Sequence, residues 1–331
     1  MKKTIFTLAA AAILLLGIYA SVKHSQKPQI GTNKIAVITT LFPLYDFAKI
    51  IGGDKVEVSL LLPPGVEPHS FEPKPSDIAQ ISRADVFIYT GEFMEPWAKD
   101  IISGVSNKKI IVVDSSVGVD MIPAVQIHEH HEDGEHNENE EHAEHEEHEH
   151  EHHHGFMDPH IWLDFDNDMI MIDNITNAFC EKDPADADFY RQNADAYKTA
   201  LAKLDGEYKT ALTNCKSRTI VYGGHYAFGY LAHRYGLQYM AAQGLSPDAE
   251  PTANDLIQLV EQIKKDDIHY VFYEELTSPK IAETLANETG TKMLLLNAAH
   301  NITRKDFENN VSFLSIMENN LSNLKTGLRC D

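Results

Sequence analysis

Short apolar, β-branched runs alternate with amphipathic stretches over most of the chain, and this alternation occurs twice. In the first half the apolar runs predict four strands: Ile35–Thr39, Val56–Leu62, Val86–Tyr89 and Ile110–Val113. The stretches between them have helical spacing and predict three helices: Leu44–Ile51, Ser76–Arg83 and Met94–Ile102. The second half predicts four strands and four helices in the same way: Thr219–Tyr222, Ala227–Tyr235, Leu237–Ala242, Asp255–Lys265, Tyr270–Tyr273, Pro279–Thr289, Met293–Leu296 and Lys305–Lys325. Because strand–helix alternation favours parallel pairing, we expect an α/β fold with two lobes, each a mostly parallel sheet flanked by helices.

A long helix is predicted between the two halves. Helical spacing covers Asn167–Cys180 and Ala185–Asn214, and Asp183-Pro184 separates them because proline suits the start of a helix. The second stretch would be about 45 Å long, enough to run along both lobes. We therefore divide the chain into a first lobe, a connecting helix and a second lobe: 34–183, 184–214 and 215–331.

The N-terminus predicts export from the cytoplasm. Lys2 and Lys3 precede an apolar run from Ile5 to Ile18, which ends near small residues. We assign 1–22 to a signal peptide or N-terminal anchor and 23–33 to a linker. The expected location is the periplasm or the outer face of the cytoplasmic membrane. No cysteine follows the run, so we expect the protein not to be a lipoprotein.

The composition and net charge limit the classes of partner that the protein can bind. The chain has 331 residues, 43% of them hydrophobic, which is enough for two cores of ordinary domain size. Its net charge is −22. An acidic chain lacks the clustered Lys and Arg that phosphate binding needs, so nucleic acid is not expected as a partner.

Export makes disulfides possible, and the chain has three cysteines. Cys215 follows one long predicted helix and Cys330 ends another, so we favour a Cys215–Cys330 bridge that holds the C-terminus. Cys180 would remain free. The alternative is three unpaired thiols.

Residues 128–154 contain 11 histidines and 12 acidic residues in 27 positions, without Lys or Arg. The histidines are His128, His130, His131, His136, His142, His145, His148, His150, His152, His153 and His154. An acidic, solvated spacer is the simpler interpretation of a charge run. Acid alone would not require so many imidazoles, which are favoured ligands of zinc, copper and nickel. We interpret the segment as a loop that collects metal weakly and cannot itself define a selective site.

Four other histidines lie at predicted strand ends or where the chain regains order. His69 follows the second strand in a loop with three prolines, and His160 follows the histidine-rich segment. His225 and His300 each follow a strand of the second half. Each alone is more often a loop or capping residue. Together, at facing strand ends, they predict a tetrahedral nitrogen site suited to zinc.

Carboxylates accompany these histidines. Asp158 and Asp164 flank the second histidine and could orient it by accepting its other N–H. Glu67 and Glu72 flank the first, and we interpret them as solvated surface groups. Two acids that follow a predicted strand of the second half are possible oxygen ligands: Glu274 and Glu275.

The chain resembles a known family in four segments: Pro64–Pro73, Asp158–Asp164, Gly224–Leu231 and Gly244–Pro251. These are similar to the extracytoplasmic metal-binding receptors of zinc and manganese ABC transporters, in particular the zinc-type branch. The likeness extends over roughly 34–328. It implies two lobes joined by one helix, a metal held between them, and delivery of that metal to an ABC-type membrane permease with its ATPase.

The resemblance also implies the ligands. It makes His69, His160 and His225 metal ligands, and a nitrogen at the third position favours Zn²⁺ over Mn²⁺, our second-choice cargo. The fourth position varies in the family between Asp, Glu and water. His300 occupies that region here and is the expected fourth ligand, while water and the two acids of the second half stay open. We predict a monomeric zinc receptor that is not an enzyme.

Two other functional classes are alternatives to a metal receptor. A secreted zinc hydrolase would use a His-Glu-x-x-His motif, and His148–His152 and His150–His154 match it. A tract of His and Glu produces such matches by chance and lacks the apolar face of a protease helix. A fully ligated histidine site would also lack the open water position that catalysis needs. The third class is a surface adhesin or metal-buffering protein.

Overall fold

The computed structural model describes residues 34–105, 107, 109–124, 157–245, 247 and 250–331. Contacts divide the chain into residues 1–34 and 35–331, and both sheets belong to the second unit. The predicted signal or anchor, the linker and the histidine-rich loop 128–154 lie outside the described residues. The predicted boundaries between lobes and connecting helix stay predictions, because 35–331 forms one compact unit.

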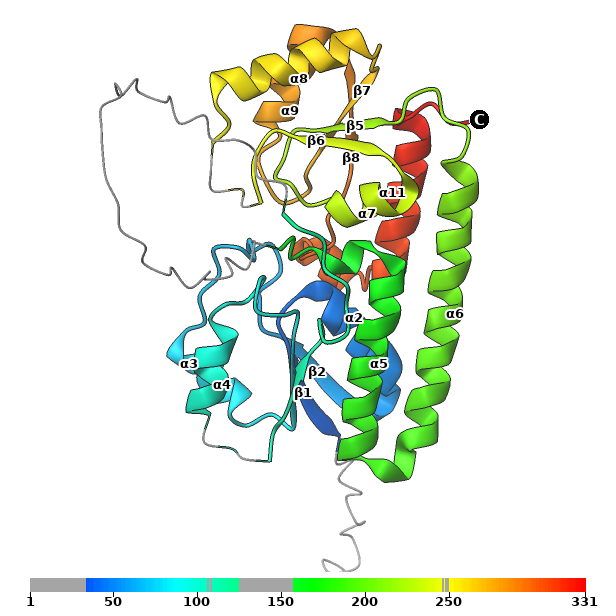
Figure 1. The fold of residues 1–331 in the computed structure, drawn as a ribbon. Coiled ribbons are helices and arrows are strands. Elements are labelled where there is room, and N and C mark those ends of the chain that lie inside the picture. The colour runs from blue at the N-terminus through cyan, green and yellow to red at the C-terminus, as the bar shows by residue number, and fades with distance from the viewer. Residues whose placement is uncertain (1–33, 106, 108, 125–156, 246, 248–249) are drawn as a thin grey trace, which may run out of the picture. The chain divides into compact units, whose positions relative to one another are not determined.

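The first lobe is built on a four-stranded parallel sheet in the order β2-β1-β3-β4 (Figure 1). Its strands are β1 (Ile35–Thr39), β2 (Val56–Leu60), β3 (Val86–Tyr89) and β4 (Ile111–Asp114). Its helices are α2 (Phe42–Gly52), α3 (Pro75–Ile81), α4 (Ala98–Gly104) and α5 (Phe165–Lys182), with the 3-10 turns η1 (Gly53–Lys55) and η2 (Ile161–Leu163). All connections between strands are crossovers, so the strand ends meet at one edge.

The second lobe repeats this plan in the order β6-β5-β7-β8, again all parallel. Its strands are β5 (Thr219–Tyr222), β6 (Gln238–Ala241), β7 (Tyr270–Tyr273) and β8 (Lys292–Leu295). Its helices are α7 (Gly229–Tyr235), α8 (Ala253–Lys265), α9 (Lys280–Thr289), α10 (Arg304–Glu308) and α11 (Phe313–Gly327). The expected α/β fold of two parallel sheets is therefore confirmed.

A single long helix, α6 (Ala187–Ala211), follows a 3-10 turn, η3 (Pro184–Asp186). It packs against α2 and α5 of the first lobe and against α11 of the second (Figure 1). Its apolar stripe, which includes Tyr190, Leu201 and Tyr208, is buried. The largest apolar cluster extends from the first sheet through this stripe to α11, so one core spans both lobes.

The structure departs from the predicted elements in two places. The last predicted helix is two helices, because Asn310 adopts a left-handed φ of 54° and Ser312 caps α11. In the first lobe, α4 begins at Ala98 and not at Met94, because the preceding turn directs Glu95 into the interior, where 3% of it is exposed.

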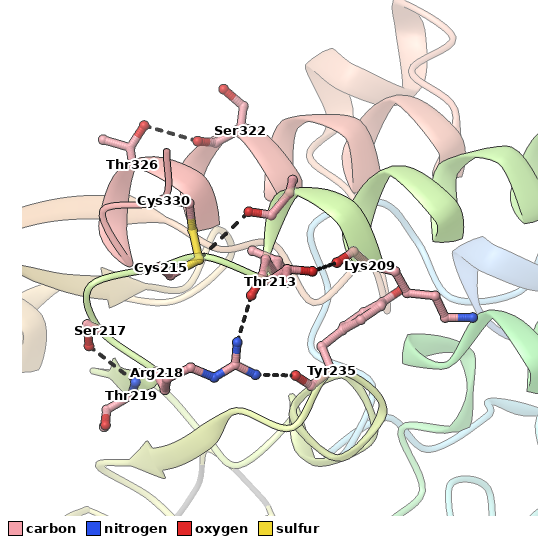
Figure 2. The surroundings of a disulfide bond; sticks show 12 residues. Lys209, Thr213, Cys215, Ser217, Arg218, Thr219, Tyr235, Ser322, Thr326 and Cys330 are labelled. Atoms are coloured by element: carbon pink, nitrogen blue, oxygen red, sulfur yellow. Dashed lines mark hydrogen bonds between the residues drawn. A yellow bond between two sulfur atoms is a disulfide. The ribbon is translucent and has the colours of Figure 1, made fainter.

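A disulfide joins Cys215, just after α6, to Cys330, just after α11 (Figure 2). Beside it, the N–H of Ser217 donates to the carbonyl of Leu328 at 3.0 Å. Arg218 donates to the carbonyls of Leu212 and Tyr235, as Figure 2 shows in part. Cys180 is a free, half-buried thiol. The bridge thus ties the end of the connecting helix to the C-terminus.

Among the described residues, no helix combines the length and apolar character needed to cross a membrane.

Candidate metal centre

Histidines from four distant segments come together at the edge where both sheets end their strands. His69 lies in the loop after β2, and His160 directly precedes η2. His225 follows β5, and His300 follows β8. His160, His225 and His300 are fully buried, whereas His69 is half-buried.

Three of the imidazoles converge through one ring nitrogen each. Nε2 of His160 lies 3.2 Å from Nε2 of His69 and 3.2 Å from Nε2 of His225. With Zn–N bonds of about 2.0–2.1 Å, two nitrogens of a tetrahedral site lie about 3.3 Å apart. The three side chains therefore have the spacing of ligands to one zinc-sized ion.

A carboxylate fixes the orientation of His160. Asp158 Oδ1 accepts both the backbone N–H of His160, at 3.0 Å, and the ring Nδ1, at 2.8 Å. Both residues are completely buried. The carboxylate thus favours the tautomer with its proton on Nδ1, which leaves the lone pair on Nε2 directed into the centre.

Glu274, directly after β7, has the same relation to His225. Its Oε1 lies 2.9 Å from Nδ1 of His225, and neither atom makes a well-aligned hydrogen bond to a described group, so an electrostatic contact holds the pair. Gly224 permits this approach, because a Cβ there would lie 2.6 Å from Glu274 Oε2. The sequence left this acid open as a ligand, and the structure places it behind the imidazole.

These two carboxylates decide what the centre can bind. If Nδ1 carries the proton in both His160 and His225, then two unprotonated Nε2 atoms face each other at 3.2 Å and cannot hydrogen-bond. Their lone pairs repel unless a cation lies between them. The arrangement therefore favours a soft or borderline divalent cation.

His300 lies beside this trio, within a second group formed with His225 and Glu274. Its Nε2 is 3.7 Å from Glu67 Oε2, and neither ring nitrogen has a hydrogen-bond partner among the described residues. Its ring centroid is 5.6 Å from that of His225. His300 is thus close enough to approach an ion held by the trio, although it does not share the 3.2 Å spacing.

Burial keeps the centre neutral. It lowers the pKa of His69, His160 and His300 well below the usual 6.5, and the neighbouring imidazoles act mainly in the same direction. Neutral imidazole is the form that binds metal. Burial also raises the pKa of Asp158 to about 7, and a cation bound to His160 would favour its ionised form.

The segments that carry the histidines are hydrogen-bonded across the two lobes. Trp162 Nε1 donates to the carbonyl of Ala298 at 2.7 Å. The amide of Asn301 donates to the carbonyls of Pro63 and Val66 at 2.9 and 2.8 Å. These bonds hold the centre together before any ion is present.

Among the described residues, the centre is exposed on the side of His69, while the other three histidines are fully buried. A cavity of about 400 Å³ is lined by His69, Phe71, Trp97 and Asp100, among others. The interpretation of Glu67 as a solvated surface group is wrong. Only 20% of its side chain is exposed, and its Oε2 is buried near His300. The local sequence carried no signal for this position, because the neighbouring group is His300 from a remote segment.

Comparison with known proteins identifies the chain. Residues 37–327 match the family described as "Zinc-uptake complex component A periplasmic". The chain belongs to this family. It is 35% identical over 324 residues to the high-affinity zinc uptake system protein ZnuA of Bacillus subtilis, which covers 98% of this chain and 97% of that protein.

Solved structures of this zinc-uptake family agree. The zinc-bound ZnuA-like domain of Streptococcus pneumoniae AdcA matches with a TM-score of 0.72 and 32% identity, over 89% of this chain and 99% of that domain. The zinc-binding lipoprotein AdcA of S. pneumoniae is 35% identical over 98% of this chain. The chain spans 61% of the length of this S. pneumoniae protein and of the zinc-binding protein AdcA of Streptococcus pyogenes.

One prediction about location is wrong. We expected an exported protein that is not a lipoprotein, because no cysteine follows the apolar run. The S. pneumoniae relative is named a lipoprotein, so attachment by lipid occurs among the proteins that this chain resembles. A missing cysteine in one stretch is not a sufficient physical ground for excluding such attachment, and that stretch lies outside the described residues. The family description fits an extracytoplasmic location.

Proposed function

We propose that the chain is an extracytoplasmic zinc receptor that captures Zn²⁺ between its lobes and delivers it to an ABC-type permease with its ATPase. His69, His160 and His225 bind the ion through Nε2, and His300 is the fourth ligand. The observation that carries this proposal is the pair of 3.2 Å separations between the Nε2 atoms of His69, His160 and His225. The names of the relatives support zinc as the cargo.

The centre is proposed to bind and not to catalyse. A hydrolase needs an open position on the metal for water. Here His300 and Glu67 occupy the side of the centre next to His225, and three of the four histidines are fully buried. The protein is proposed to act as a monomer, since one chain supplies every ligand.

The test measures zinc affinity by competition with a chelating dye. His225→Ala should abolish tight binding, because it removes the ligand shared by both histidine groups. His233→Ala is the matched control, since this exposed histidine lies on α7 nearby and should leave the affinity unchanged. Unchanged affinity in His225→Ala would reject the site.

The histidine-rich loop has a separate role in this proposal. Many weak sites raise the local metal concentration near the centre, as linked sites raise effective concentration. Deletion of 128–154 should remove weak binding and leave one tight site, which calorimetry can count. Loss of the tight site would make the loop itself the receptor. Manganese should bind more weakly than zinc to the intact chain, because imidazole ligands favour zinc.

A further inference from the structure

A nearly buried arginine lies where three helices meet beside the metal centre. Arg234, on α7, has 8% of its side chain exposed. Its Nη1 lies 2.6 Å from Asp164 Oδ1 and 2.7 Å from Asp166 Oδ2. Its Nε and Nη2 donate to the two carboxylate oxygens of Asp205 at 2.8 and 2.9 Å. One guanidinium thus binds three carboxylates.

These carboxylates belong to different parts of the fold. Asp164 caps the N-terminus of α5 and stands four residues after His160. Asp205 is on the connecting helix α6. Arg234 stands on the helix that follows His225. The arginine therefore connects the segment of one metal-binding histidine in the first lobe to the segment of another in the second.

A second contact from α7 holds the other end of the His160 segment. The hydroxyl of Tyr230 donates to the carbonyl of Asp158 at 3.1 Å and accepts the N–H of Ile122 at 3.2 Å. Residues 158–164 are thus held to α7 at both ends. The first residue of α7, Gly229, packs directly against this segment. A Cβ at that position would lie only 2.5 Å from Asp158 Oδ2, so a larger residue would force one of the two to shift.

The chemistry of the cluster requires arginine. A planar guanidinium can meet carboxylates in several fixed directions at once, whereas an ammonium is a single point charge. Two of the acids are mostly buried, with 15% of Asp164 and 11% of Asp205 exposed. Burial raises the pKa of Asp205, but bonds from Arg234, Lys209 and Tyr235 outweigh it and bring that pKa to about 2. Asp205 is therefore ionised at physiological pH, whereas burial raises the pKa of Asp164 in spite of its contact with Arg234.

We infer that Arg234 is a positioning residue for the metal centre, which sets the separation of His160 from His225 before the ion arrives. This rests on the proposed function. Without the arginine, α7 and the start of α5 lose their common anchor, and part of the binding free energy must be used to bring the two imidazoles together.

The experiment compares Arg234→Met and Arg234→Lys with wild type. Zinc affinity is measured on folded protein, and the visible spectrum of the Co²⁺-loaded form reports the ligand geometry. Both variants should bind zinc about 10- to 100-fold more weakly and lose the intense tetrahedral Co²⁺ bands. Lysine should not restore them.

Lys198→Met is the matched control. Lys198 also joins α6 to α5, through Asp173 at 2.6 Å, but it does not contact α7. It should lower the melting temperature slightly and leave affinity and the Co²⁺ spectrum unchanged. A folded Arg234→Met with wild-type affinity and spectrum would overturn the inference, since a purely structural role moves only the melting temperature.

If Arg234→Met does not fold, Asp164→Asn and Tyr230→Phe decide the matter, because each removes one contact to the His160 segment. Weaker zinc binding in both supports the inference, and wild-type affinity in both overturns it. Absence of tight zinc binding in the wild type would instead reject the proposed function. The two failures are therefore distinguishable.

Discussion

Two buried glutamates occupy corresponding places in the two lobes and have different surroundings. Glu95 lies in the turn after β3, and Glu274 directly follows β7. The strands β3 and β7 have the same position in their sheets. Glu95 accepts bonds from the hydroxyl of Thr40 and from two backbone N–H groups, those of Thr90 and Gly91. It stabilises the strand ends of its own lobe.

Glu274 faces an imidazole instead. Its nearest partner is His225, which lies in the loop after β5, and β5 has the place in its sheet that β1, followed by Thr40, has in the other. In the first lobe the acid faces a hydroxyl, that of Thr40, and stabilises a turn. In the second lobe the acid faces His225, a candidate metal ligand. The comparison teaches that the shared topology supplies the place for a buried acid, and the facing side chain determines its use.

The charges of the two acids differ accordingly. Burial raises the pKa of Glu95 to about 7, and its hydrogen bonds only partly offset this. Burial also acts to raise the pKa of Glu274, but its interactions with His225 outweigh it and the pKa is lowered. Glu274 therefore stays an anion behind the candidate metal centre, where a cation would need compensating charge.

The largest expected effect concerns Glu95 and pH. Its pKa is higher in the folded chain than the ordinary 4.5, so the folded state binds more protons and loses stability as pH rises toward 7. Glu95→Gln should remove this loss and gain about 3 kcal/mol relative to wild type between pH 5 and pH 8. Urea unfolding of the apo-protein at both pH values measures it. The exposed Glu92→Gln should follow wild type, and equal curves for all three would contradict the assignment.

Next in size is the effect of Glu274 on zinc. Glu274→Ala should weaken zinc binding by about 10- to 100-fold, because His225 loses the group that orients it. Glu95→Ala is the counterpart in the other lobe and should lower stability without changing the affinity of folded protein. Equal affinities in the two variants would mean that the glutamates do not differ in role.

A smaller effect is expected from proton competition at the histidines. If three histidines had the ordinary pKa of 6.5, the fraction of molecules with all three rings neutral would fall about 30-fold between pH 7 and pH 6. Burial lowers the pKa of His69, His160 and His300, so zinc affinity should change by less than about tenfold over that range. Competition titrations at the two pH values test this, and a 30-fold loss would show that the rings titrate as exposed ones.

The smallest effects come from the threonines that contact the two acids. Thr40→Val removes a buried donor to Glu95 and should lower the free energy of unfolding by about 1 kcal/mol. Thr277→Val removes only a 3.4 Å contact to Glu274 and should change neither stability nor zinc affinity measurably. Thermal melts and the dye competition check both. A larger loss in Thr277→Val would show that this threonine, and not His225, holds Glu274.

The fold could be predicted well because the central strands of both sheets are largely buried on both faces. Such strands appear as short β-branched runs, and all eight lie where these runs predict them. Local patterns failed where tertiary contacts prevail. The start of α4 was predicted too early, since nothing in Met94–Trp97 indicates that Glu95 turns inward to bind Thr40.

The candidate site divides in the same way. Strand-end positions and motifs indicated its histidines, because parallel strands end at a common edge. The roles of Glu67 and Glu274 could not be predicted, since each depends on a side chain from a remote segment. Arg234 carried no signal at all, because its three partners stand at least 29 positions away.

The two hydrogen bonds that the side-chain amide of Asn301 donates to the carbonyls of Pro63 and Val66 have a mechanical consequence. They attach the proline-rich loop of the first lobe to the second lobe, so that the position of His69 depends on both lobes. If the lobes move apart, these hydrogen bonds must lengthen before the imidazole of His69 can move outward. Separation of the two lobes would therefore have to break hydrogen bonds made by one small, uncharged side chain that is not among the proposed ligands.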